Sequence, residues 1–480
     1  MAVGMTRLRG RRRLLVGSGL GALCIAGVVV VTVQPDTVSV GPVDTRDVLR
    51  TDTLPPNPMQ VLVDGQAARA FILLTGYPMR LAIVDTRTGR LLQTVTLPHP
   101  VVLATVDEAL GRLYLFGDND RALSAQGGTL DVFDVQTGTI ISTSALRVTL
   151  AGSSSSGPGT ATPFTRWGPL VLTAAGTHLT LLTRHGGHVV YDVAVGMVAR
   201  LLALDDRTGY TVVAGEGNAG SGAVAVLDTR TGRRLRTSQV GASPCALAVD
   251  EASGHVFVAT GTSSTASASA PGGGSGTLDV LDAQTGGVVR AVSVGQGPYA
   301  VAVAPRTHRV FVLNMGSGSV TTVDAGTGHV VRTVALPAHP QALVVDDRAG
   351  RVFVANVGNV RQDLAGLHLY YSVGPAPLCL PRPPMNLSPG SGSVSVIDAR
   401  SGRRLGTIRT GTNPTMLSND ERAGRVIVVS PVVAVIGRPP LQRVLSWLRT
   451  WVPGPWLPPP DNHYAYRYMP ASDSVIDATH

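Results

Sequence analysis

Short apolar stretches separated by turns recur along most of this chain. Residues 330–336 alternate apolar and polar side chains, which predicts a half-buried strand, and residues 342–345 are continuously apolar, which predicts a strand buried on both faces. Residues 351–356 and, after a long insertion, residues 393–398 predict two more strands. Four strands therefore make one repeat, and 342–345 is its innermost strand.

Two kinds of turn recur at a fixed interval. The first kind ends in glycine seven times, at Gly89, Gly138, Gly187, Gly232, Gly286, Gly328 and Gly402. In six cases the position 22 residues later ends a second turn, with glycine in five cases and His308 in the sixth. The spacing from each second turn to the next first turn is variable. Insertions therefore occur only within that part of the repeat. A repeat with one half of constant length and one half of variable length is typical of a radial repeat fold, the β-propeller.

An aspartate opens most turns of the first kind. An Asp side chain at that position accepts hydrogen bonds from backbone N–H groups two residues on, and glycine near the end of the turn takes a positive φ without a steric clash. We expect these carboxylates to cap turns and not to bind calcium, because each lies in a different repeat. They are Asp85, Asp134, Asp228, Asp282, Asp324 and Asp398.

The ends of the chain predict a closed ring. Residues 474–478 repeat the pattern of 395–399, and the chain then stops before an outer strand. Residues 37–41 resemble the outer strand 291–295, so we expect them to complete the last blade and remove its open edge. The count is then eight four-stranded blades, with seven as the alternative because the repeat is degenerate over residues 141–200.

Two strands carry a recognisable motif. Phe311-Val312-Leu313-Asn314 and Phe353-Val354-Ala355-Asn356 are each followed by a glycine-containing turn and a strand ending in an Asp-led turn. In these features the chain resembles the YVTN-repeat β-propellers of the lactonase-like superfamily, over about residues 60–430 and the last strand. The resemblance implies an all-β propeller, usually of seven blades. Related propellers include lactonases and dehydrogenases, but fold alone implies neither activity.

Composition and charge agree with an all-β protein outside the nucleic-acid-binding classes. The 480 residues include 56 Gly and 33 Pro but only 4% aromatic side chains. The formal charge is +9, and an N-terminal cluster supplies five units, which leaves 9 − 5 = +4 for the rest. No basic stripe interleaved with aromatic residues follows, so we predict no nucleic-acid partner.

The N-terminus predicts a membrane anchor. Residues 14–33 are uncharged and contain eleven Leu, Ile or Val, and as a helix they would span the hydrocarbon core. The arginines of residues 1–13 would stay in the cytoplasm, and the propeller, assigned to residues 36–480, would be outside. We expect a single-pass cell-membrane protein. The alternatives are a secreted protein after signal cleavage or twin-arginine export, since Arg11-Arg12-Arg13 precedes the apolar run.

Three cysteines give no metal-binding or haem-attachment motif. Cys24 lies in the apolar segment, and Cys245 and Cys379 lie in the predicted propeller. The last two could pair outside the cell, or one could be a buried thiol and the other a loop thiol, because connectivity cannot be deduced from sequence.

The insertions should share one rim of the propeller, since the loop between the second and third strands lies on the same side as the crossover between blades. The main ones are residues 117–128, 261–276, 357–392 and 431–472. The last contains Trp447, Trp451 and Trp456, with apolar residues at helical spacing. This segment either covers the propeller's own rim or contacts a partner or the membrane surface.

A second group of candidates lies near the mouth of the predicted central channel. His99 and His339 occupy equivalent crossovers, and Tyr299, Asn314 and Asn356 are nearby by register. The histidines are weak candidates for metal binding, because two residues in distant repeats define no ligand geometry. We predict no cofactor.

No nucleophile elbow, zinc-protease motif, phosphate-binding loop or haem motif is present. We therefore expect a membrane-anchored, extracytoplasmic binding module of the cell envelope, with an envelope protein or a glycan as partner. The alternative is a lactonase-like hydrolase, or an oxidoreductase with a metal or quinone cofactor in the channel.

Overall fold

A computed structural model describes residues 48–54, 58–76, 78–117, 128–146, 164–173, 176–184, 188–217, 221–261, 275–337, 339–357, 367–370, 391–412, 414–430, 434–437, 465–468 and 471–477. The chain divides after Pro42, and every described residue belongs to the unit Val43–His480. The predicted membrane segment 14–33 lies outside the described residues. Within them, no helix is long and apolar enough to cross a membrane.

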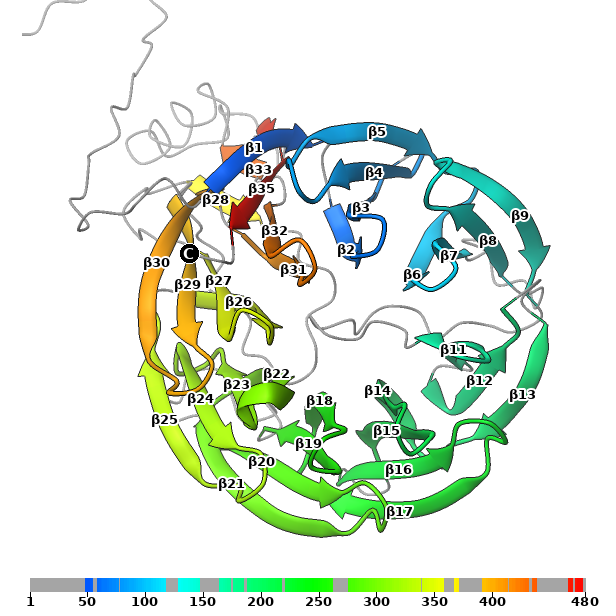
Figure 1. Cartoon of the computed structure of the whole chain (residues 1–480), viewed down its shortest axis with the longest axis vertical. Helices are drawn as coiled ribbons and strands as arrows, with labels where there is room; N and C mark the ends of the chain where they lie inside the picture. Colours follow the sequence, from blue (N-terminus) through cyan, green and yellow to red (C-terminus); the bar gives the residue numbers. More distant parts are fainter. Residues whose placement is uncertain are drawn as a thin grey trace, which may run out of the picture. The chain divides into compact units, whose positions relative to one another are not determined.

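The described part of the chain forms eight four-stranded sheets and one three-stranded sheet. The eight follow one another around a ring, each with its first strand toward the centre and its fourth on the circumference (Figure 1). We number these blades 1 to 8 in ring order, starting from the sheet β2-β3-β4-β5. All neighbouring strands within a blade are antiparallel, as in a β-propeller.

Each blade contributes one strand to each of four positions, from the centre of the ring outward. In the order of blades 1 to 8, the innermost strands are β2 (Pro58–Asp64), β6 (Val101–Asp107), β10 (Phe164–Thr165), β14 (Val198–Asp205), β18 (Pro244–Asp250), β22 (Pro298–Ala304), β26 (His339–Asp346) and β31 (Met416–Asp420). The second strands are β3 (Arg69–Leu74), β7 (Arg112–Gly117), β11 (Gly168–Thr173), β15 (Tyr210–Glu216), β19 (His255–Thr260), β23 (Arg309–Asn314), β27 (Arg351–Val357) and β32 (Arg425–Ser430). The third strands are β4 (Arg80–Asp85), β8 (Thr129–Asp134), β12 (His178–Leu182), β16 (Gly222–Asp228), β20 (Ser275–Asp282), β24 (Ser319–Asp324), β29 (Ser391–Asp398) and β35 (Ala471–Asp477). The outer strands are β5 (Leu91–Thr96), β9 (Thr139–Ala145), β13 (Val189–Ala194), β17 (Arg234–Val240), β21 (Val288–Gln296), β25 (Val330–Ala335), β30 (Arg404–Thr412) and β1 (Val48–Leu54).

Blade 3 is irregular, which explains why the sequence was compatible with either seven or eight blades. Its innermost strand, β10, has only two residues, whereas every strand of the other seven blades has at least five. The four strands predicted between residues 330 and 398 are found, as β25, β26, β27 and β29, but they do not form one blade. β25 is the outer strand of blade 6, and the other three belong to blade 7. A short 3-10 helix, η4 (Pro305–Thr307), occupies the first turn of blade 6.

The hydrophobic core is divided among the spaces between blades. Each of the eight core clusters combines side chains from two adjacent blades, as when Ala283 of blade 5 packs against Leu201 and Val212 of blade 4. The cluster between blades 8 and 1 joins Ile427 to Ile72. Apolar burial therefore closes the ring as well as filling it.

The ring is also closed by strand pairing, but not by the residues expected. β1 pairs antiparallel with β35, from Val48 opposite Ile476 to Leu54 opposite Ala471. The predicted strand 37–41 lies outside the described residues, and the outer strand of blade 8 is Val48–Leu54 instead. Register in a sheet depends on the whole pairing and on its bulges, which a five-residue resemblance does not capture.

The two turn types have the expected backbone. Gly89 and Gly402, in first-type turns, have φ of 69° and 65°. Gly111, in a second-type turn, has φ of 60°, and His308 takes φ of 53° where the sequence lacks glycine. The fixed 22-residue spacing thus separates two turns that each contain a left-handed residue, and an outer strand, a crossover and an innermost strand lie between them.

Candidate functional site

The blades present two different faces. In blade 1, Arg69 lies opposite both Asp64 and Asp85, so the connections from strand one to two and from three to four lie at the same end. We call this end the turn face, and the opposite end, with the second-to-third connections and the crossovers, the loop face. The four predicted insertions all join second to third strands and therefore all belong to the loop face.

The two longest insertions meet in a small sheet that the sequence did not predict. β28 (Leu367–Tyr370) belongs to the insertion of blade 7, and β33 (Ala434–Gly437) and β34 (Ala465–Tyr468) belong to that of blade 8. β28 pairs antiparallel with β33, and β33 with β34. The insertions of neighbouring blades are therefore parts of one element, which we call the insert sheet. Trp447, Trp451 and Trp456 lie outside the described residues, and their role stays a prediction.

The predicted channel residues Tyr299, Asn314 and Asn356 are buried. Tyr299 lies in the core between blades 6 and 7, where burial raises the pKa of its hydroxyl. Asn314 Nδ2 donates to Thr321 Oγ1 (3.0 Å), and Asn356 Nδ2 donates to Ser395 Oγ (3.0 Å). The asparagines link second to third strands, and ligand contact by any of these residues stays a prediction.

The two candidate histidines belong to different blades. His99 is partly exposed, and its Nδ1 is 3.1 Å from Oδ2 of the buried Asp131, whose Oδ1 also accepts from Thr143 Oγ1 (2.5 Å). His339 is the first residue of β26, in blade 7, whereas His99 precedes the first strand of blade 2. Among the described residues, no group of three or more His, Cys, Asp or Glu side chains is placed to hold a metal ion.

A buried polar position in the third strand was missed at the sequence level. Three residues before the first-type turn begins, several blades carry a buried polar side chain, namely Asp131, Thr180, Asp279, Thr321 and Ser395. Each forms a hydrogen bond near the loop-face end of its blade, as when Asp279 Oδ2 accepts from the Gly241 N–H (2.8 Å). The sequence did carry a signal for this position: a polar residue between apolar neighbours, such as Asp131 in Leu130-Asp131-Val132.

Buried aspartates recur at the turn-face ends of the innermost strands. Six innermost strands end in a buried aspartate, namely Asp64, Asp107, Asp205, Asp250, Asp346 and Asp420. The next residue often reaches the preceding blade: Glu251 accepts from the Asp206 N–H (3.0 Å) and Glu421 from the Asp347 N–H (3.2 Å). These contacts connect the first turns of adjacent blades.

A pocket of about 490 Å³ opens on the turn face between blades 2, 3 and 4. Arg184 forms an ion pair with the buried Asp107 at 3.3 Å, and Arg166 stacks over Trp167 at 4.7 Å. Glu108 also lines the pocket, and its pKa is raised by burial and by the nearby Asp64. The pocket is lined by both positive and negative side chains, which suits a polar ligand. The ion pair between Arg184 and Asp107 also joins two neighbouring blades.

Cys245 is disulfide-bonded. The chain's other cysteines, Cys24 and Cys379, both lie outside the described residues, so the pairing of Cys245 with Cys379 stays a prediction. Cys245 itself is buried in β18 of blade 5. Of the two sequence alternatives for Cys245, the bonded one is therefore found.

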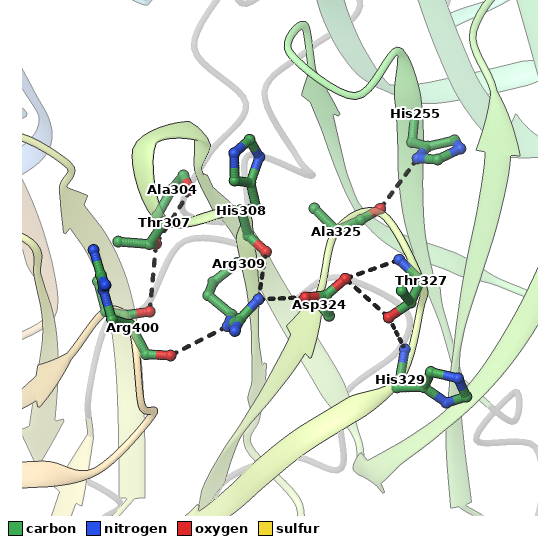
Figure 2. A network of polar contacts seen from close by, with 11 residues as sticks. His255, Ala304, Thr307, His308, Arg309, Asp324, Ala325, Thr327, His329 and Arg400 are labelled. Carbon is green, nitrogen blue, oxygen red and sulfur yellow. Dashed lines mark hydrogen bonds and ion pairs between the residues drawn. The ribbon is translucent and has the colours of Figure 1, made fainter.

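A polar network on blades 5 to 7 shows how the turns are joined (Figure 2). Asp324 Oδ1 accepts from the Thr327 N–H (2.8 Å), which caps the turn as predicted. Arg309 contacts the same carboxylate and donates through Nε to the Arg400 carbonyl of blade 7 (3.2 Å). His255 Nδ1 lies 3.1 Å from the Ala325 carbonyl and links blade 5 to blade 6. These side chains are engaged in joining blades.

Comparison with known proteins adds little beyond the fold. No protein-family model and no curated protein matches the chain. Similar solved structures include BamB from Moraxella catarrhalis (13% identity, 79% of this chain and 96% of that one, TM-score 0.49) and Kuenenia stuttgartiensis hydrazine synthase (14%, 63% and 94%, 0.48). A eukaryotic initiation factor is also similar (10%, 80% and 86%, 0.49). The assignment as a β-propeller follows from the strand pairing of this chain itself.

Proposed function

We propose that this chain is a YVTN-type propeller that acts as a binding module of the cell envelope, held at the membrane by residues 14–33 and exposing its loop face to a protein partner. The insert sheet is the observation that carries the proposal. A propeller blade needs no such sheet, because its four strands are already paired. An element assembled from two insertions on one face has the character of a recognition surface on a rigid scaffold.

The insert sheet also offers a specific mode of binding. Among the described strands, β28 and β34 each have one hydrogen-bonded neighbour, so each leaves one backbone edge for a further strand. Addition of a strand from a partner protein satisfies such an edge through main-chain hydrogen bonds. A protein partner therefore fits this element better than a glycan.

The disulfide supports the extracytoplasmic location. Disulfides form and persist in oxidising compartments and are rare in the cytosol. The apolar segment 14–33 with arginines before it predicts the same orientation. The bond at Cys245 and the leader are independent features, and both favour a propeller outside the cytoplasm.

Photo-crosslinking in intact cells tests this function. A photoreactive amino acid at Tyr370 in β28 or Tyr466 in β34 should give a discrete protein adduct, and the same residue at the exposed Arg87 on the turn face should not. Adducts that digest with glycosidase but not protease would indicate a glycan instead. Equal adduct patterns from all three positions, or none from the insert sheet, would overturn the proposal. Protease sensitivity of a tag at His480 in spheroplasts checks the orientation.

A further inference from the structure

The outer strand of every blade begins with a β-bulge. In blade 5, Leu281 lies opposite Val288 and Val280 lies opposite Arg290, which leaves Val289 without a cross-strand partner. The same register shift occurs at the start of the outer strand in the other seven blades. The eight bulge residues are Leu49, Leu92, Ile141, Val190, Leu235, Val289, Val331 and Leu405.

Every one of these bulge residues is aliphatic, and most are exposed. Six of them are 40–59% exposed: Leu92, Ile141, Val190, Val289, Val331 and Leu405. Of the eleven large hydrophobic residues that are exposed in the described part of the chain, nine lie in bulges or directly before them at the start of outer strands. A bulge residue pairs with nothing in its sheet, so the fold does not require an apolar side chain there.

Arginines accompany the aliphatic positions. Arg236, Arg290 and Arg332 directly follow a bulge residue, and all three are exposed. The outer strands β17, β21, β25 and β30 contain no Asp or Glu. The aspartates of the adjoining turns are held by the backbone, as when Asp398 Oδ1 accepts from the Ser401 N–H (2.7 Å). We call the six exposed bulge residues and these three arginines the bulge belt.

The bulge belt lies at the turn face, and the outer strand of blade 8, β1, begins at the same face. Val48 lies opposite Ile476, the residue before the turn aspartate, which is the level of Val288 opposite Leu281 in blade 5. β1 therefore begins at the turn face. Fourteen residues, 34–47, separate it from the predicted membrane segment, and even fully extended they reach only about 50 Å. In an anchored propeller, the start of β1 at the turn face is thus at most about 50 Å from the end of the membrane segment.

We propose that the bulge belt is a contact surface for an anionic membrane, with the aliphatic side chains entering the headgroup region and the arginines binding lipid phosphates. This inference rests on the membrane anchor of the proposed function. Exposed aliphatic residues mixed with arginine are the composition of interfacial membrane-binding surfaces. The turn face then points to the bilayer, and the insert sheet points away from it, toward a partner in the envelope.

The test uses the full-length protein in vesicles of phosphatidylcholine, with or without about 30% phosphatidylglycerol. A fluorescent NBD-bearing amino acid replaces Val289, or, as the control, Gln296 at the other end of β21. We expect nitroxide headgroup lipids to quench the probe at 289 in anionic vesicles and leave the probe at 296 unchanged. The R290Q/R332Q variant should lower the contacting population by about fivefold per arginine.

The experiment distinguishes failure of the membrane contact from failure of the membrane anchor. If the protein stays in the vesicles after an alkaline carbonate wash but 289 is quenched no more than 296, the contact is overturned and the anchor is not. If the wash removes the protein, the anchor fails and the contact fails with it. An NBD spectrum at 289 that shifts to the blue without quenching by lipid would mean that a second copy covers the belt, which also overturns the proposal.

Discussion

Thr86 Oγ1, in blade 1, donates a hydrogen bond of 2.5 Å to Oδ2 of the buried Asp420 in blade 8. The two residues are 334 positions apart. Thr86 follows the first-type turn aspartate Asp85, and Asp420 ends the innermost strand of the preceding blade. Arg184 and Asp107 stand in the same relationship between blades 3 and 2. This inter-blade contact therefore occurs at two steps of the ring with different chemistry, a hydroxyl donor in one and a guanidinium in the other.

Replacing Thr86 by valine should destabilise the closed ring. The change keeps the side-chain volume but leaves Asp420 Oδ2 buried without this donor, which costs about 1–3 kcal/mol. Urea unfolding of the purified protein measures the loss. Thr322→Val is the matched control, because Thr322 Oγ1 is buried and has no hydrogen-bond partner among the described residues. A T86V variant no less stable than T322V would contradict the closing role of this bond.

Adding a hydroxyl at the equivalent place in blade 5 should stabilise the protein. Ala283 follows Asp282 as Thr86 follows Asp85, and Asp205 Oδ2 of the preceding blade is buried with no hydrogen-bond partner within the described structure. Ala283→Ser should supply that donor and raise the free energy of unfolding by about 0.5–1.5 kcal/mol. The same substitution in a D205A background, which has no side-chain acceptor at that position, should lose most of the gain, which separates the new bond from a general effect of serine.

Two aspartates of blade 7 should respond to pH in opposite directions. Burial raises the pKa of Asp346, so its favourable contribution is complete below the unfolded value near 3.8 and is lost as pH rises through the raised pKa. Asp346→Asn should therefore gain stability relative to the native protein as pH rises toward about 7.

The pKa of Asp398 is lowered by hydrogen bonds from the Ser401 hydroxyl and backbone. Its contribution is present above 3.8 and lost as pH falls through the lowered pKa. Asp398→Asn should cost about 1 kcal/mol near neutral pH and nothing in acid. Unfolding of both variants across the acid range measures the two slopes, and slopes of the same sign would refute this assignment.

The disulfide at Cys245 should resist alkylation. Under non-reducing, denaturing conditions Cys245 should remain unlabelled, and peptide mass mapping should reveal which cysteine it joins. Reduction should lower the free energy of unfolding by about 2–4 kcal/mol. Cys245→Ser provides the comparison, since it should be as stable as the reduced native protein. Free thiol at Cys245 in protein purified without reductant would contradict the bond.

Removing the closing strand should damage the whole ring. Deletion of residues 48–54 takes away the partner of β35 and exposes its edge, at a cost of roughly 3 kcal/mol or more in lost hydrogen bonds, with aggregation as the visible result. Deletion of residues 37–41 is the control and should leave the thermal midpoint unchanged. Equal damage from the two deletions would mean that the earlier segment also takes part in closure.

The sequence alone determined the repeat, the four-stranded unit and the placement of insertions on one face. It could do so because turn chemistry is local: Asp324 caps a turn formed by its own next residues, and Gly328 permits the φ that the turn needs. It did not yield the closing register of Val48–Leu54, the burial of Asn314 and Asn356, or the insert sheet.

Those features depend on contacts between residues far apart in the chain, such as Thr86 with Asp420 and Leu369 opposite Val435. In the sequence, the bulge residues look like ordinary members of strands in which apolar and polar side chains alternate. Only the pairing of each outer strand with its neighbour showed that Val289 and its equivalents have no cross-strand partner, because a bulge is a property of two strands and not of one.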